Sequence, residues 1–150
     1  MSKRYPIRYA YKVCDGQTPT VVIPAKVEAA LRQSLENRQV EQGGILGASS
    51  GEISHFIPDT AALCDQNLFQ PSDEMNRVIA QWAQQNIAFA GLVHSHPADR
   101  PHLSHADLMY VTRLLQENPQ LPAVIMGIMA GQELLLYGFE RDFLPPSVRN

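Results

Sequence analysis

The chain has 150 residues, of which 45% are hydrophobic and 18% are charged, and its net charge is -3. This length is sufficient for one independently folding domain, and the mildly acidic balance argues against nucleic acid or an acidic membrane surface as a partner. The two cysteines, Cys14 and Cys64, form no Cys-x-x-Cys pair. Because the sequence has neither a signal peptide nor an apolar run near eighteen residues, we expect reduced thiols and a cytoplasmic location.

The first half of the chain shows the hydrophobic periodicity of an α/β protein. Residues 1–12 alternate basic with aromatic or aliphatic side chains, which predicts an edge strand with one solvated face. Short apolar runs then predict strands, and apolar stripes at helical spacing predict helices. The expected strands cover residues 20–23, 43–48 and 52–58, and the expected helices cover residues 24–37 and 72–85, the second capped by Ser72 with Trp82 in the core.

The second half continues this alternation. The run from Ile87 to Val93 is apolar and is followed by Pro97, which predicts a buried strand. Residues 104–117 carry a helical apolar stripe with Ser104 as the expected N-cap. Residues 123–130 and 133–139 predict a hairpin. We expect a single domain over residues 1–150, with its core at about 20–140 and a short exposed tail from Arg141.

The spacing His94-x-His96, followed by Ser104 and Asp107, is the most informative pattern in the chain. Alternate residues of a strand share a face, so both imidazoles can chelate one ion. Asp107 lies on the inward side of its helix, where a cation would offset the burial of its charge. From the chain's own composition, the full pattern arises by chance in roughly one such sequence in two thousand. Two histidines and one aspartate suit a single zinc ion and leave a fourth position open.

Two further residues could supply chemistry to this site. Glu41 precedes Gly43 and Gly44 in a Gly-rich apolar segment, where another backbone or a substrate can approach closely, and it is the candidate general base. Ser104-x-x-Asp107 also has the spacing of a capping box, which is a purely structural role. Capping of the helix and binding of a metal by Asp107 are compatible roles, because a cap would hold Asp107 rigidly.

Taken together, Glu41, His94-Ser95-His96, Ser104 and Asp107 resemble the JAMM motif of the MPN+ zinc metallopeptidases, and the resemblance covers roughly residues 20–140. It implies that His94, His96 and Asp107 bind zinc, that Glu41 is the catalytic acid/base and that Ser104 stabilises the oxyanion. The implied fold class is α/β, a single-domain MPN/JAMM fold with a mixed sheet flanked by about three helices, resembling the cytidine-deaminase-like architecture. The short chain is most similar to compact, stand-alone prokaryotic members.

The same resemblance implies a substrate. Family members cleave next to the C-terminal Gly-Gly of ubiquitin-like proteins or of bacterial sulfur-carrier proteins, so we expect such a protein as the partner. An extended tail could add to a sheet edge, with Gly43 and Gly44 near the scissile bond. Three alternatives stay open: a non-catalytic zinc-binding assembly module, a general small-peptide amide hydrolase, and a metal-binding protein associated with DNA repair. The sequence does not indicate an oligomeric state.

Other polar residues have simpler interpretations. Gly47-Ala48-Ser49-Ser50-Gly51 matches the nucleophile-elbow pattern, but a strand follows it where that pattern needs a helix, so a hairpin turn is expected. His55 is expected to be a hydrogen-bonded core or edge imidazole. Ser95 should face away from the ligands and serve in packing or in the outer shell. The roles of His102 and His105 are left open.

Overall fold

A computed structural model describes residues 2–9, 19–59, 63–64, 69–70 and 73–141 of the chain. These ranges contain nine strands and three helices. In chain order they are β1 (Lys3–Arg8), β2 (Thr20–Ile23), α1 (Ala25–Leu35), β3 (Gly43–Ser49), β4 (Glu52–Pro58), β5 (Leu63–Cys64), β6 (Phe69–Gln70), α2 (Glu74–Gln84), β7 (Ala88–His96), α3 (His105–Glu117), β8 (Ala123–Ala130) and β9 (Glu133–Glu140).

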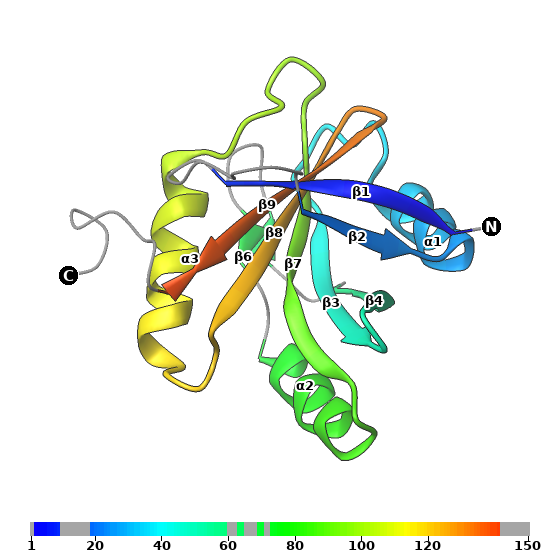
Figure 1. The fold of residues 1–150 in the computed structure, drawn as a ribbon. Helices are drawn as coiled ribbons and strands as arrows, with labels where there is room; N and C mark the ends of the chain where they lie inside the picture. Colours follow the sequence, from blue (N-terminus) through cyan, green and yellow to red (C-terminus); the bar gives the residue numbers. More distant parts are fainter. Residues whose placement is uncertain (1, 10–18, 60–62, 65–68, 71–72, 142–150) are drawn as a thin grey trace.

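Seven strands close into a mixed barrel with the order β1-β2-β4-β3-β7-β8-β9, and β5 pairs with β6 in a separate two-stranded sheet. The pairs β1/β9, β2/β4 and β7/β8 are parallel, and the other barrel pairs are antiparallel. Closure depends on β1, which pairs with β2 on one side and with β9 on the other, where Ile7 lies opposite Leu136. Figure 1 shows β1 crossing β9 between the two ends of that strand.

The predicted fold class is therefore wrong. We expected the single-domain MPN/JAMM fold, a mixed sheet flanked by about three helices, and the strands instead form a closed barrel. The predicted edge position of the first strand is wrong for the same reason, since β1 has a partner on both sides. Hydrophobic alternation identifies a strand and its buried face, but it does not identify the strand's partners. Closure of the barrel depends on which strands pair, and periodicity does not reveal this.

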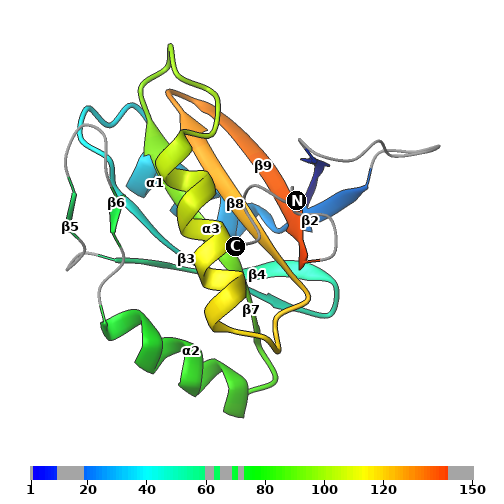
Figure 2. The same cartoon turned by 90° about the vertical axis from the view of Figure 1, so that its left-hand side faces the viewer.

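Apolar side chains on the two faces of the strands form two hydrophobic clusters. One contains the buried face of α1, namely Val27, Leu31 and Leu35, and the other contains residues of α2 and α3. The adjacent residues Ile45 and Leu46 of β3 belong to different clusters, as the alternation of a strand requires. Figures 1 and 2 show α1 and α3 on opposite sides of the strands. Burial of each large apolar side chain contributes about 1.5–3 kcal/mol to folding.

Most predicted elements are confirmed within one to three residues. Ser104 caps α3, the last two strands form the expected hairpin, and Trp82 is buried. The second helix begins at Glu74 with Asp73 as its N-cap, and Ser72 lies outside the described residues, as do Cys14 and residues 142–150. The two-residue strands β5 and β6 were not predicted, because they are too short to show periodicity. Among the described helices, none is long and apolar enough to cross a membrane.

Candidate metal centre

The two histidines lie at the C-terminal end of β7, a strand paired with β3 on one side and with β8 on the other. Its last six residues are buried, and Pro97 follows at once. Alternation along the strand directs both imidazoles to one face, as predicted, and their Nε2 atoms lie 2.9 Å apart. His94 is 2% exposed and His96 is 4% exposed, so solvent competes little for these nitrogens.

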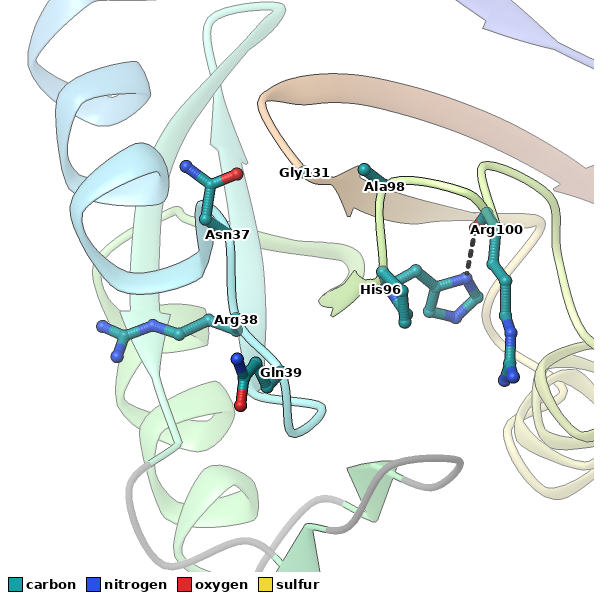
Figure 3. Close-up of a pocket in the computed structure, with 8 residues that line it drawn as sticks. Asn37, Arg38, Gln39, His96, Ala98, Arg100 and Gly131 are labelled. Carbon is teal, nitrogen blue, oxygen red and sulfur yellow. Dashed lines mark hydrogen bonds between the residues drawn. The ribbon is translucent and has the colours of Figure 1, made fainter.

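His96 is held by its other ring nitrogen. Its Nδ1 lies 3.0 Å from the backbone carbonyl oxygen of Arg100, to which Nδ1–H can donate a hydrogen bond (Figure 3). In the neutral ring this bond places the proton on Nδ1 and leaves the lone pair on Nε2. Nε2 is the atom that faces His94. The bond to the loop after β7 therefore leaves the Nε2 lone pair of His96 available to a metal ion. The Arg100 carbonyl was not predicted, because nothing in the sequence indicates where a loop carbonyl points.

Asp107 reaches the histidines from the first turn of α3. The capping box is complete: the Ser104 hydroxyl accepts a hydrogen bond from the Asp107 backbone N–H at 3.0 Å, and Asp107 Oδ2 accepts one from the Ser104 backbone N–H at 2.9 Å. The same carboxylate contacts both imidazoles, with Oδ1 at 3.0 Å from His94 Nε2 and Oδ2 at 3.4 Å from His96 Nε2. The structural role and the placement beside the histidines thus coexist.

The electrostatics of this cluster favour an ionised Asp107. Burial acts to raise the pKa of Asp107, but hydrogen bonds from His94, His96 and the Ser104 backbone outweigh it and hold the pKa well below its usual range. Burial acts to lower the pKa of His96, but Asp107, the Arg100 carbonyl and Glu41 outweigh it and raise the pKa above its usual value. Negative charge thus accumulates around the two rings and favours a cation between them.

Glu41 approaches the same two histidines from a segment far from Asp107 in the sequence. It lies between α1 and β3, two residues before the first residue of β3, and it is buried. Its Oε1 is 3.4 Å from His96 Nε2. Glu41, His94 and His96 offer ligand atoms that all lie within 4.8 Å of one another. Two carboxylates therefore face one pair of imidazoles, and the geometry alone allows either of them to complete a three-ligand set.

The separations fit a small tetrahedral ion. Ligand atoms at about 2.0–2.1 Å from zinc lie roughly 3.3 Å from one another at tetrahedral angles. Four pairs, namely His94–His96, His94–Asp107, His96–Asp107 and His96–Glu41, are separated by 2.9 to 3.4 Å, and Asp107 makes its two contacts through different oxygens. Imidazole nitrogen with carboxylate oxygen is also a donor set that zinc accepts. The buried cluster can therefore hold a metal ion.

A cavity of about 340 Å³ opens directly onto this cluster. Glu41, His96 and Ser104 line it, together with His102 and Leu103 from the loop that leads to α3. Ser104 uses its oxygen to accept the capping bond, so its hydroxyl hydrogen can still be donated into the cavity. His102 and His105 are both exposed, and of the two only His102 lines this cavity. The cavity thus brings the candidate base and the candidate oxyanion donor together.

A second cavity, of about 440 Å³, meets the first at His96, Pro97 and Arg100. Figure 3 shows it between the segment from Asn37 to Gln39 on one side and His96 with Arg100 on the other. The wall formed by residues 37–39 was not predicted from the sequence. Asn37 has a positive φ of 55°, and its backbone N–H donates to the Gly131 carbonyl. Asparagine just after a helix is a recognisable C-terminal signal, but its position facing His96 depends on barrel closure.

Gly43 and Gly44 lie in β3 and line neither of these two cavities. Gly43 pairs with His94 across the β3/β7 ladder. A Cβ on Gly44 would lie 2.1 Å from the Ile57 carbonyl oxygen and 2.8 Å from the Phe56 ring. The close packing of β3 on β4 therefore explains Gly44, and the role of both glycines as substrate contacts stays a prediction.

No protein-family model matches the chain, and no curated protein matches it. A solution structure of a protein from Desulfitobacterium hafniense, determined as a structural genomics target, is similar at 20% sequence identity. The similarity covers 79% of this chain and 82% of that chain, with a TM-score of 0.45.

Proposed function

We propose that this protein is a zinc-dependent peptidase or isopeptidase that hydrolyses an amide bond after the Gly-Gly terminus of a ubiquitin-like or sulfur-carrier protein. The single observation that carries the proposal is the convergence of His94, His96, Asp107 and Glu41 beside a cavity that also contains Ser104. The motif spacing resembles that of the JAMM metallopeptidases. Because the fold differs from the one expected, the side chains of the site support the proposal and the fold does not.

In this proposal the residues divide into ligands and catalytic groups. His94, His96 and Asp107 hold one zinc ion per chain, which when bound polarises the scissile carbonyl and makes water a better nucleophile near neutral pH. Glu41 accepts a proton from the attacking water and passes it to the leaving amine. Ser104 donates its hydroxyl hydrogen to the developing oxyanion. The capping box supports this division, because it holds Asp107 and Ser104 in a fixed relation.

The two cavities that meet at His96 supply room on both sides of the reacting carbonyl. In this proposal the smaller cavity, which Glu41, His96 and Ser104 line, holds the scissile bond, and the larger one receives the chain segment on one side of that bond. A Gly-Gly tail is compatible with a metal buried at a strand end, since a chain without side chains approaches most closely.

The test uses zinc-loaded protein and ubiquitin-like proteins that carry short C-terminal extensions after Gly-Gly. Intact mass should locate cleavage directly after the second glycine, with activity lost on chelation and restored by zinc. Glu41→Gln serves as the matched control, because it keeps the shape of the side chain and removes the base. No cleavage of any Gly-Gly substrate would contradict the proposal. Chelator-sensitive cleavage of unrelated short peptides would instead indicate a general amide hydrolase.

A second candidate function, a non-catalytic zinc module, is favoured by one specific observation. Glu41 Oε1 is as close to His96 Nε2 as Asp107 Oδ2 is, at 3.4 Å. If both carboxylates bound the ion together, four protein ligands would close the site, as in structural zinc centres. Zinc content separates the two functions: a Glu41→Gln protein that loses its zinc supports the closed site, and one that retains it supports the catalytic role.

A further inference from the structure

Ser95 lies between the two histidines and is fully buried, with 0% of its surface exposed. Strand alternation directs its side chain away from the face that carries the imidazoles. Its Oγ accepts a hydrogen bond from the Gln42 backbone N–H at 2.9 Å and makes a longer contact, at 3.5 Å, with the Val40 carbonyl oxygen. The Ser95 backbone N–H donates to the Gln42 carbonyl at 2.8 Å. One residue of β7 therefore bonds to both neighbours of Glu41.

These bonds matter because the segment that carries Glu41 has no regular secondary structure. It connects the end of α1 to the start of β3, and Val40 is 41% exposed. Glu41 is nonetheless buried and reaches His96. The two residues that flank Glu41 are hydrogen-bonded to β7, the strand that carries the histidines. The position of Glu41 relative to the histidines is therefore fixed by these bonds.

We propose that Ser95 is a positioning residue, which fixes the backbone of residues 40–42 so that the Glu41 carboxylate lies at the correct distance from the His94–His96 pair. This inference rests on the proposed function for its effect on turnover. A misplacement of about 1 Å at a reacting group can lower a rate by about 100-fold. A partial displacement of Glu41 should therefore lower kcat by about 10-fold and leave the histidines where they are.

The principal variant is Ser95→Ala, which deletes the acceptor of the Gln42 N–H and leaves the strand in place. We expect unchanged zinc content, a kcat about 10-fold lower, and a KM close to that of the wild type. Amide hydrogen exchange should accelerate at Gln42. Ser95→Thr keeps the hydroxyl and should recover most of the lost kcat, a rescue that a role in packing alone would not produce.

Ser54→Ala is the matched control. The Ser54 hydroxyl bonds to Ser49 at 2.8 Å on the β3–β4 hairpin, so this variant also loses a partly buried serine hydrogen bond. It should change neither kcat nor exchange at Gln42. If Ser95→Ala does not fold, Ser95→Cys keeps the volume while forming longer and weaker hydrogen bonds, and its kcat should lie between those of the wild type and Glu41→Gln.

A folded Ser95→Ala protein with wild-type kcat and wild-type exchange at Gln42 would overturn the inference, and so would a folded Ser95→Cys protein with wild-type kcat. Equal losses of zinc and of activity would also overturn it, because they would make Ser95 a support for the ligands. If the wild-type protein cleaves no Gly-Gly substrate, the proposed function is wrong. The exchange at Gln42 still decides whether Ser95 fixes the Glu41 segment, since that readout needs no substrate.

Discussion

The histidine on β4 and the pair at the end of β7 occupy similar backbone settings and have different surroundings. His55 Nδ1 lies 2.8 Å from the Ser54 hydroxyl, and its ring centroid is 5.9 Å from that of Trp82. Both of these groups are uncharged. His94 and His96 instead face each other and two carboxylates. The converging carboxylates therefore distinguish His94 and His96 from His55 as candidate metal ligands.

Alanine substitutions at the candidate ligands and at His55 should show the largest difference between the two places. Removing even an outer-shell partner weakens metal binding by about 10–100-fold. We therefore expect His94→Ala and Asp107→Ala each to lower the zinc affinity by a larger factor. His55→Ala should retain one zinc per chain. Zinc content of the purified proteins measures the difference. Full zinc occupancy in both His94→Ala and Asp107→Ala would refute the ligand assignment.

A second prediction separates the two carboxylates that face the histidines. Glu41→Gln should keep the zinc and the fold but lower kcat by about 100-fold or more, the scale of removing a general base. The amide retains the volume of the carboxylate and cannot accept a proton from water at neutral pH. Steady-state kinetics on a Gly-Gly substrate, alongside zinc content, measures both effects. Unchanged turnover would mean that another group activates the water.

Ser104 tests whether capping and chemistry share one side chain. Ser104→Ala should destabilise the protein by about 0.5–2 kcal/mol through the lost cap, and should raise the activation barrier by about 2–4 kcal/mol if the oxyanion donor is lost. Ser104→Asp keeps a capping acceptor but has no hydroxyl, so it should recover stability and not turnover. Thermal unfolding and kcat of both variants separate the two roles. Recovery of turnover in Ser104→Asp would leave Ser104 a purely structural role.

Removing the metal should loosen the site on β7 and leave the hairpin that carries His55 unchanged. Binding to the folded state alone stabilises a protein by about 2.7 kcal/mol when the free ligand is at 100 times its Kd. Chelation should therefore lower Tm by several degrees, and zinc should restore it in proportion to its concentration. Differential scanning calorimetry with and without chelator checks this. A Tm independent of zinc would contradict binding to the folded state.

The smallest expected effect is on pH dependence. In the metal-free protein the raised pKa of His96 contributes stability that is fully present below its unfolded value near 6.5 and is lost as pH rises through the higher folded value. The lowered pKa of Asp107 contributes stability that is present above its unfolded value and is lost as pH falls through the folded value. Zinc needs the neutral imidazole, so its affinity should decrease as the pH falls through the raised folded-state pKa of His96. Calorimetric titration at two pH values measures this change.

Some features of the fold and of the site could be predicted from the sequence, and others could not. His94, His96, Ser104 and Asp107 could be brought together from strand alternation and one helical turn, which are local periodicities. Barrel closure could not be predicted, because the pairing of β1 with β9 joins residues far apart in the chain. The anchoring of the Glu41 segment by Ser95 is equally non-local. Local order was thus predictable, and the resemblance to a known motif placed Glu41 beside the histidines, but the strand pairings between distant segments were not predictable.

The most direct test of the account is a crystal structure of the zinc-loaded protein with anomalous data collected at the zinc edge. We predict one zinc peak per chain, about 2.0–2.1 Å from Nε2 of His94, Nε2 of His96 and a carboxylate oxygen of Asp107. Glu41 should lie beside the ion without binding it, so that the fourth position stays open to solvent. A zinc ion bound by Glu41 as a fourth ligand, or no peak between the two histidines, would contradict the account.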